Sequence, residues 1–383
     1  MKVVTICAER APFARTGGLG DVTAALPEAL LAVEPTLEHV TVLPLYGAAR
    51  PLLQGRLRPV GPFQELVDDA PYRTLFFPHP QFEPQGLYDG PEEKFGLLCR
   101  AVVDAFDDAD VFHLHDWHGA HAATLTTTRT VLTIHNLAYQ GPFLRDGIAA
   151  ADVVTTVSEQ YAEEIQTEPF GCGLHGLLAE RGVVGILNGI AAAEVPHRDR
   201  TGLLADAGLA GSDLLFGVVS RLDWHKGLDW VADVIPRLDE LPARLVLLGT
   251  GDPALEERFA SLASDRFHPW LHFDPARADQ ILAGADALLI PSRFEPCGLT
   301  QLYAMRAGTV PVVHPVGGLA DTVADPERGF HMTEASPAGL FSAMGRAVEA
   351  WNTPAWDQRV DGGRRWDSSW RRSAERYLEI FAG

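Results

Sequence analysis

The sequence predicts an α/β fold made of two doubly wound domains, and three observations support this. Short apolar runs alternate with longer helical patterns along the 383 residues, as in β-α-β units. The runs show no strict in-out alternation, which is typical of parallel strands that helices cover on both faces. Residues 190–213, rich in alanine, glycine and charge, contain no such run and separate two groups of them. The length also suits two domains of about 100 to 200 residues.

The expected strands come in two groups. In the first half they are residues 3–7, 40–43, 111–115, 130–134, 153–157 and 183–187. In the second half they are residues 214–219, 245–248, 287–290 and 310–313. We therefore expect one domain over residues 1–192 and a second over residues 193–365.

Composition and charge exclude some classes of partner. The chain is 46% hydrophobic and 21% charged, an ordinary balance for a globular protein. With 51 acidic and 31 basic residues its formal charge is −20, so we expect no binding to nucleic acid or to an anionic membrane. A phosphate-bearing substrate would have to meet locally concentrated arginine and lysine.

The sequence also indicates a compartment. The first strand is expected to begin almost at residue 1, so we expect no signal peptide, and no apolar run approaches the roughly 18 residues of a membrane span. The four cysteines, Cys7, Cys99, Cys172 and Cys297, lie far apart and form no CxxC pair. We interpret them as reduced thiols that mostly pack in the interior of a cytoplasmic protein.

Chemically useful side chains follow the carboxyl ends of the expected strands in both halves. A histidine-rich segment from His115 to His118 follows one strand, His135 follows the next, and Asn188 and Arg221 follow two more. In open α/β sheets, ligands bind outside the carboxyl ends of the strands. Turn chemistry explains glycine and asparagine at such places, but not histidine, tryptophan and arginine so regularly. The pattern predicts one ligand crevice lined by both halves.

The most informative of these places is the turn that contains Glu295. This carboxylate lies directly before Pro296, between a buried strand and a helix expected to begin near Gly298. Proline restricts the backbone there, and free amides at the start of the helix can hold an anion beside the carboxylate. Such a turn suits a glycosyl-phosphate site. The alternative is that Glu295 only caps the helix or forms a surface salt bridge.

Two further segments are candidates for binding phosphate. Arg221 and Lys226 stand five residues apart across a strand-to-helix junction, so both could reach one diphosphate. The glycine-rich residues 15–21 open the first long helix, where backbone amides can approach an oxyanion closely. The alternatives are solvated surface cations and a tight turn without a ligand.

No metal site is expected. The spacing of His115, His118 and His135 fits neither a zincin helix nor a zinc knuckle. Asp108 and Asp110 resemble the DxD element of metal-dependent sugar transferases, but they precede a strand, at the opposite end from the crevice. We expect His135 to bind sugar hydroxyls, with a hydrogen-bonded core histidine as the alternative.

Ten motifs, in order along the chain, resemble those of bacterial glycogen synthases and plant starch synthases. They are residues 16–22, 113–118, 133–141, 155–158, 185–190, 219–228, 248–252, 291–303, 317–323 and 367–370. The resemblance runs from end to end of the chain, and the motif around Glu295 alone is close to diagnostic.

The resemblance implies a GT-B fold, in which two Rossmann-like domains face each other across a cleft. The N-terminal domain would form the acceptor side and the C-terminal domain the nucleotide-sugar donor side, with a last helix over residues 366–383 packing back on the N-terminal domain. The implied reaction transfers glucose from a nucleotide-glucose, usually ADP-glucose, to the non-reducing end of an α-1,4-glucan with retention of configuration. No metal or other cofactor is implied.

The resemblance also implies roles for individual residues. Arg221 and Lys226 would hold the diphosphate, Glu295 would contact the donor glucose, and His135 would bind near the sugar 6-hydroxyl. The other residues of the donor site would be Arg15, Thr16, Gly17, Gly18, Asp116, Asn188, Phe273, Cys297, Gly298, Leu299 and Thr300.

The chain departs from the family pattern in several places. Arg15 stands where lysine is usual, Phe273 where a tyrosine often stacks on the base, and Ala191 where aspartate is usual. The segment 141–152 and the segment after residue 190 are tens of residues shorter than is typical, which affects the expected acceptor surface.

Three functions remain open from the sequence. A retaining glucosyltransferase is favoured. A non-catalytic glucan-binding relative is the second, and the retained Arg221, Lys226 and Glu295 argue against it. A dinucleotide oxidoreductase is the third, disfavoured because neither glycine-rich loop reads GxGxxG.

Overall fold

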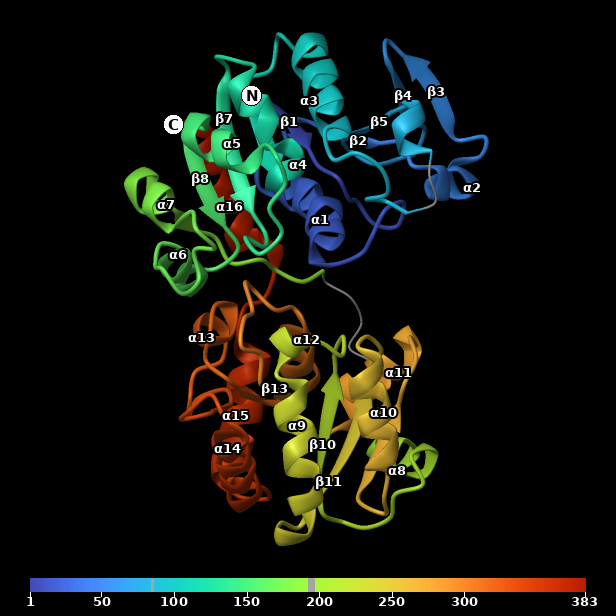
Figure 1. Ribbon diagram of the computed structural model, residues 1–383, viewed down its shortest axis with the longest axis vertical. Helices are drawn as coiled ribbons and strands as arrows, with labels where there is room; N and C mark the ends of the chain where they lie inside the picture. Colours follow the sequence, from blue (N-terminus) through green and yellow to red (C-terminus); the bar gives the residue numbers. More distant parts are fainter. Residues whose placement is uncertain (84–85, 192–196) are drawn as a thin grey trace. The chain divides into compact units, whose positions relative to one another are not determined.

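The computed structural model describes residues 1–83, 86–191 and 197–383. They form two compact units (Figure 1): unit 1 is Met1–Ala191 with Ser369–Gly383, and unit 2 is Ala192–Ser368. The predicted boundary between residues 192 and 193 lies outside the described residues and stays a prediction.

Unit 1 is built on one sheet. Its strands are β1 (Lys2–Ile6), β2 (Glu38–Pro44), β3 (Leu57–Val60), β4 (Phe63–Leu66), β5 (Arg73–Phe77), β6 (Val111–His115), β7 (Arg129–Ile134), β8 (Val153–Thr156) and β9 (Val184–Gly185). The spatial order of the strands that the described residues form is β3-β4-β5-β2-β1-β6-β7-β8-β9. From β5 to β9 all neighbours pair in parallel. The chain order reverses between β1 and β6, which makes this the topological switch point of the sheet.

One edge of this sheet is antiparallel, beside the parallel strands that the sequence predicted. β3 pairs with β4, and β4 with β5, in antiparallel fashion. No residue of β3 is fully buried, so its sequence carries no continuous apolar run. β3 was therefore not predicted, and neither were its neighbours β4 and β5.

Helices cover the sheet of unit 1. They are α1 (Gly18–Val33), α2 (Arg50–Leu53), α3 (Lys94–Ala105), α4 (Asp116–Ala120), α5 (Leu144–Ala150), α6 (Glu159–Ile165), α7 (His175–Arg181) and α16 (Trp370–Ala382). The C-terminal α16 packs beside α1 in unit 1, where Trp370 and Tyr377 share a core with Leu26 of α1 and Val3 of β1. Residues nearly 350 positions apart thus close one face of the sheet (Figure 1).

Unit 2 has the strand order of a dinucleotide-binding domain. Its strands are β10 (Leu214–Val219), β11 (Ala243–Leu248), β12 (Phe267–Trp270), β13 (Ala287–Ile290), β14 (Val310–Val313) and β15 (Phe330–His331). All pair in parallel, in the order β12-β11-β10-β13-β14-β15. Numbered from β10, this is the order 3-2-1-4-5-6, whose switch point lies between β10 and β13. Two strands were not predicted: β12 is only half-buried at its carboxyl end, and β15 has two residues.

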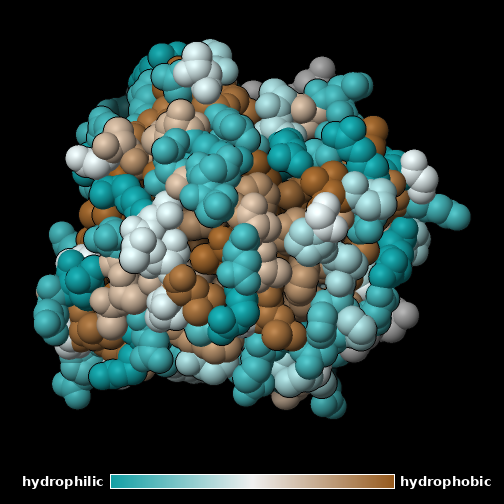
Figure 2. Space-filling view, turned by 90° about the horizontal axis from the view of Figure 1, so that it is seen from above, coloured by the Kyte–Doolittle hydropathy of each residue, from teal (hydrophilic) through white to brown (hydrophobic). Residues whose placement is uncertain are grey.

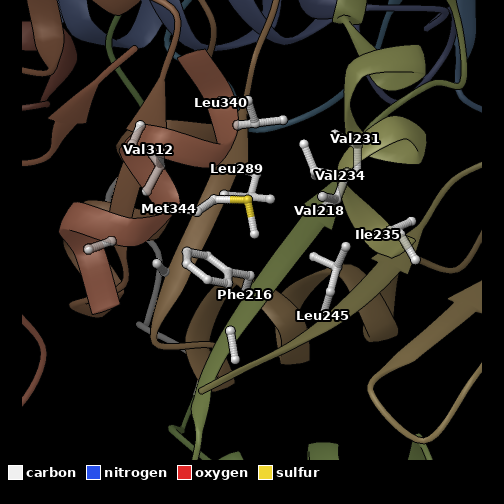
Figure 3. Packing of buried hydrophobic residues seen from close by; sticks show 14 of the residues in the cluster. Phe216, Val218, Val231, Val234, Ile235, Leu245, Leu289, Val312, Leu340 and Met344 are labelled. Atoms are coloured by element: carbon white, nitrogen blue, oxygen red, sulfur yellow. The ribbon is translucent and has the colours of Figure 1, made fainter. Parts of the chain in front are cut away.

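Two apolar cores lie on opposite faces of this sheet. The helices are α8 (Arg200–Asp206), α9 (Leu228–Val234), α10 (Pro253–Ser261), α11 (Pro275–Gly284), α12 (Thr300–Ala307), α13 (Gly318–Thr322), α14 (Pro337–Ala350) and α15 (Pro354–Arg365). Phe216 of β10 packs with Val231 of α9 and Leu340 of α14 (Figure 3). The next residue along the strand points the other way, so Leu215 packs with Leu203 of α8 and Ile281 of α11. Helices on both faces explain why the strands lack in-out alternation.

Short 3-10 helices complete the fold at Gly47–Ala49, Pro80–Phe82, His121–Thr124, Trp224–Lys226 and Ile235–Glu240. On the face drawn in Figure 2, hydrophobic residues lie among hydrophilic ones, which is ordinary for a protein surface. None of the helices in the described residues is long and apolar enough to cross a membrane.

Candidate functional site

Lys226 and Glu295 form an ion pair at the switch point of unit 2. Lys226 ends the 3-10 helix that follows β10, and Glu295 lies in the turn that follows β13. Lys226 Nζ lies 2.9 Å from Oε1 and 2.7 Å from Oε2 of Glu295, and Ser292 Oγ donates to Oε2 at 2.8 Å. The Lys226 side chain is 23% exposed and that of Glu295 is 10% exposed, so the lysine is partly accessible to solvent and the carboxylate is nearly buried. Glu295 is therefore salt-bridged, but its partner is the residue predicted to bind phosphate.

Arg293 fixes the two segments that carry this pair. Its guanidinium donates to both carboxylate oxygens of Asp229, at 2.6 and 2.7 Å, and to the carbonyl oxygen of Trp224 at 2.7 Å. Its backbone N–H donates to the carbonyl of His225 at 2.8 Å. The turn after β13 is thus tied to the segment after β10. Arg221, at the start of that segment, is exposed, with Nη2 3.5 Å from a carboxylate oxygen of Asp223.

Two glycines press against the backbone of Glu295. The N–H of Gly318 donates to the carbonyl oxygen of Glu295 at 3.1 Å. Gly317 has φ +45°, and a Cβ added there would lie 2.0 Å from that same oxygen. No side chain fits at residue 317 without moving the carboxylate-bearing turn.

We expect Gly317→Ala to destabilise unit 2 by about 2 to 3 kcal/mol, because it combines left-handed strain with a backbone clash. Urea unfolding should show the loss as a lower midpoint. Gly345→Ala is the matched control, since a Cβ at that helical position meets no atom within 4 Å. Equal midpoints for the Gly317→Ala protein and the wild type would refute the close packing at this turn.

The glycine-rich loop lies at the switch point of unit 1, after β1. Thr16, Gly17 and Gly18 are exposed, and a Cβ added to either glycine meets no atom within 4 Å. The backbone N–H groups of Thr16 and Gly17 point inward and donate to Oε2 of Glu9, at 2.7 and 3.4 Å. Arg15 forms a surface ion pair with Asp21 at 2.9 Å.

Asp116 follows β6, the other strand of this switch point. It adopts φ +52°, and its Oδ1 accepts the backbone N–H of His135 at 2.7 Å. Burial raises the pKa of Asp116 to about 7, although backbone hydrogen bonds from His135 and Asn136 oppose the shift. The carboxyl group thus titrates near neutral pH.

His135 is both internally bonded and partly accessible. Its Nε2 lies 2.8 Å from Nδ1 of His115, and one of the two nitrogens carries the shared proton. Burial lowers the pKa of His135 to about 3, so the ring is neutral. It can act as a hydrogen-bonding group but not as a cation.

The remaining predicted residues divide between the switch points and the sheet edges. Cys297 is buried in the turn after Glu295, and Gly298 (φ +70°) leads through Leu299 and Thr300 into α12. By contrast, Asn188 and Phe273 follow the edge strands β9 and β12. Asn188 is buried, with no hydrogen-bond partner for Oδ1 among the described residues, and Phe273 is 82% exposed.

Comparisons with known proteins identify the family. A family model described as the starch synthase catalytic domain matches residues 2–180, and one described as glycosyl transferases group 1 matches residues 213–350. A glycogen synthase of Anaeromyxobacter dehalogenans is 38% identical over 474 residues, covering 100% of this chain and 99% of the relative. The chain belongs to the glycogen synthase family.

Solved structures of related proteins agree. The catalytic domain of starch synthase IV from Arabidopsis thaliana, bound to ADP and acarbose, superposes with a TM-score of 0.86 at 27% identity and covers 99% of this chain and 98% of that one. A sucrose-phosphate synthase from Thermosynechococcus elongatus gives a TM-score of 0.70 at 18% identity, with 100% and 98% coverage, and shows likeness of fold alone. The predicted GT-B fold class is confirmed, and the enzyme class is glycosyltransferase.

This member of the glycogen synthase family is short. Its alignment with the Anaeromyxobacter relative spans 474 residues, whereas the chain has 383, so about 90 positions have no residue here. Both family models nevertheless match this chain, one in each half. Since the alignment covers 100% of this chain and 99% of the relative, the additional residues of the relative lie within the alignment rather than beyond its ends.

The Asp108 and Asp110 pair has a structural role. Lys2 donates to Asp108 through Nζ at 2.7 Å and to Asp110 through its backbone N–H at 2.6 Å, which anchors the start of β1. These carboxylates lie at the amino ends of β1 and β6, opposite the switch point. Within the described residues, no cluster of three or more histidine, cysteine or acidic side chains could hold a metal ion.

Sequence reasoning missed three residues that build the site: Glu9, Ser292 and Arg293. Ser292 and Arg293 lie inside the motif that was singled out, but their partners come from distant segments. Glu9 had a usable signal, because it is a lone carboxylate directly after an apolar strand and before the glycine-rich loop.

Proposed function

We propose that this chain transfers glucose from ADP-glucose to the non-reducing end of an α-1,4-glucan with retention of configuration. Membership of the glycogen synthase family supports the reaction, and the ADP in the structure of the Arabidopsis relative supports the donor. The observation that carries the proposal is the Lys226–Glu295 ion pair after β10 and β13. A nucleotide-sugar at a switch point presents a diphosphate next to a hexose, which matches a cation next to a carboxylate.

The charges of this pair suit the transition state. Breaking the bond between the anomeric carbon and the diphosphate builds negative charge on the leaving group and positive charge on the sugar. We assign Arg221 and Lys226 to the diphosphate and Glu295 to the sugar. Because Lys226 and Ser292 already bind both oxygens of Glu295, we assign the carboxylate to charge stabilisation rather than nucleophilic attack. The departing phosphate oxygen would then take the proton of the acceptor hydroxyl on the same face of the sugar.

The other roles are proposed by analogy with the family. We assign unit 1 to the acceptor side, with neutral His135 as a hydrogen-bonding partner of the sugar, and unit 2 to the donor side. The proposed donor-binding residues are Arg15, Thr16, Gly17, Gly18, Asp116 and Asn188 in unit 1 and Phe273, Cys297, Gly298, Leu299 and Thr300 in unit 2. We propose that the reaction needs no metal or other cofactor and takes place in the cytoplasm. The formal charge of −20 supports the absence of nucleic acid as a partner.

The test is a transfer assay with purified protein, ADP-glucose or UDP-glucose, and a maltooligosaccharide primer. We expect release of ADP and primers lengthened by single α-1,4-linked glucose units, and no loss of rate in the presence of EDTA. UDP-glucose is expected to react more slowly. If neither donor lengthens the primer, the proposed function is wrong. If glucan binding persists without transfer, the non-catalytic glucan-binding alternative is favoured instead.

A further inference from the structure

Glu9 lies buried beneath the exposed glycine-rich loop. It follows β1 and retains 3% of its exposure. Its Oε2 accepts the N–H groups of Thr16 and Gly17, and its Oε1 accepts the hydroxyl of Thr16 at 2.6 Å. Its own carbonyl oxygen accepts the hydroxyl of Thr23 in α1 at 2.5 Å. The carboxylate therefore fixes both the backbone and the side chain of the loop from the inner side.

The same carboxylate binds a second segment. The Tyr88 hydroxyl donates a short hydrogen bond to Oε1 of Glu9. The segment that carries Tyr88 is anchored in turn by Lys94, which is 1% exposed and donates to the carbonyl of Asp89 at 2.5 Å. Glu9 is thus the junction between the glycine-rich loop and residues 86–89.

Burying the Glu9 carboxylate beneath the loop costs desolvation free energy. Among the described residues no cation contacts Glu9, so neutral N–H and O–H donors alone offset its desolvation. Its negative charge also lies just behind a loop that is proposed to meet an anion, which opposes binding of that anion. An uncharged side chain could fill the same space at lower cost. The buried Glu9 carboxylate is useful if the glycine-rich loop must be held in a single conformation.

We propose that Glu9 is a positioning residue of the transfer reaction: by holding Thr16 and Gly17 from beneath, it keeps the glycine-rich loop in the conformation that meets the donor diphosphate. This rests on the proposed function. The inward N–H groups of Thr16 and Gly17 donate to Glu9 and are therefore not free to bind the donor. The loop therefore meets the donor with its outer side, which is open at Gly17 and Gly18.

Glu9→Gln tests this, because an amide has the same shape but only one accepting oxygen. We expect kcat/KM for ADP-glucose to fall by about 10 to 100-fold, as a small misplacement of a binding loop does. The KM for the glucan primer should change less than about twofold. Trypsin should also cleave after the exposed Arg15 at least several-fold faster than in the wild type, since the loop is no longer held.

Matched variants separate positioning from other roles. Glu28→Gln makes the same change at an exposed position of α1. It should leave kcat/KM for ADP-glucose and the rate of cleavage after Arg15 unchanged. Thr16→Ser keeps both donors to Glu9 and should retain the slow cleavage, whereas Thr16→Val should accelerate it. If Glu9→Gln fails to fold by circular dichroism, Tyr88→Phe removes one contact and should still speed cleavage after Arg15.

Three results would overturn the proposal: kcat/KM within about threefold of wild type in Glu9→Gln, lost activity with unchanged cleavage after Arg15, or a defect confined to the KM of the glucan. The second and third would mean that Glu9 acts on substrate directly. The trypsin assay does not depend on glucose transfer. It therefore measures how firmly the glycine-rich loop is held even if the wild type transfers no glucose. Failure of the proposed function and failure of the Glu9 role are therefore distinguishable.

Discussion

Replacing Lys226 by alanine should lower kcat for glucose transfer by about 10² to 10³, equivalent to roughly 3 to 4 kcal/mol of transition-state stabilisation. The change removes the ammonium that bridges both oxygens of Glu295 and is proposed to neutralise the leaving diphosphate. Glu295→Ala should cause a loss of similar size, because it removes the charge that faces the sugar. Initial-rate kinetics with saturating ADP-glucose and primer would measure both.

Three variants control this experiment. Lys226→Arg keeps the charge but not the compact ammonium, so we expect an intermediate loss of about tenfold. The double variant Lys226→Ala/Glu295→Ala should lose less than the product of the single losses, since the two groups act as a unit. Arg258→Ala breaks an exposed ion pair with Asp233 and should leave kcat unchanged. A Lys226→Ala protein that folds and keeps more than a tenth of the wild-type kcat would remove Lys226 from the catalytic role.

The fold was predictable where strands are buried on both faces. β6, β10, β13 and β14 were located from continuous apolar runs with the bounds that the structure has. The edge strand β3 was not located because no residue of it is fully buried, and the apolar residues of its partner β4, Phe63 and Leu66, are separated by Gln64 and Glu65. Their pairing depends on neighbours that the local sequence does not reveal.

The sequence predicted which segments form the site, but not the hydrogen bonds and ion pairs between them. Polar residues after strand ends located the segments of Lys226 and Glu295, because parallel strands bring those ends to one edge. Their mutual ion pair, and the clamp of Arg293 on Asp229, join residues 69 and 64 positions apart. Such contacts depend on strand order, which local patterns do not fix. His135 is hydrogen-bonded to His115, as the alternative for this residue predicted, and its binding to sugar hydroxyls stays a prediction.

Unit 1 should unfold in mild acid. Five of its histidines are held neutral, because burial lowers the pKa of His39, His118 and His135 to about 3 and those of His113 and His115 well below the ordinary value. Below about pH 6.5 the unfolded chain binds protons that the folded unit does not, so stability falls as pH falls. At pH 5 the three histidines whose pKa is about 3 each cost about 2 kcal/mol, or roughly 6 kcal/mol together.

One group in unit 1 opposes this trend. The pKa of Asp116 is raised to about 7, so its folded form binds a proton first and gains about 2 kcal/mol of stability between pH 7 and pH 5. The net loss from these three histidines and Asp116 is about 4 kcal/mol, which is a large part of the roughly 5 to 15 kcal/mol stability of a typical domain. In unit 2, partial burial lowers the pKa of His268. Hydrogen exchange at pH 5 should therefore show loss of protection in residues 1–191 before residues 197–368.

His118 offers the sharpest variant for this prediction. Neither ring nitrogen has a hydrogen-bond partner among the described residues, and the ring lies against Trp117, Phe95 and Tyr88. His118→Phe should therefore stabilise unit 1 at all pH values and add about 2 kcal/mol more at pH 5 than at pH 8, since one fewer group must remain unprotonated. The exposed His272, changed to glutamine, is the matched control and should not move the acid midpoint. Equal gains at pH 5 and pH 8 would show that desolvation of His118 does not drive the acid unfolding.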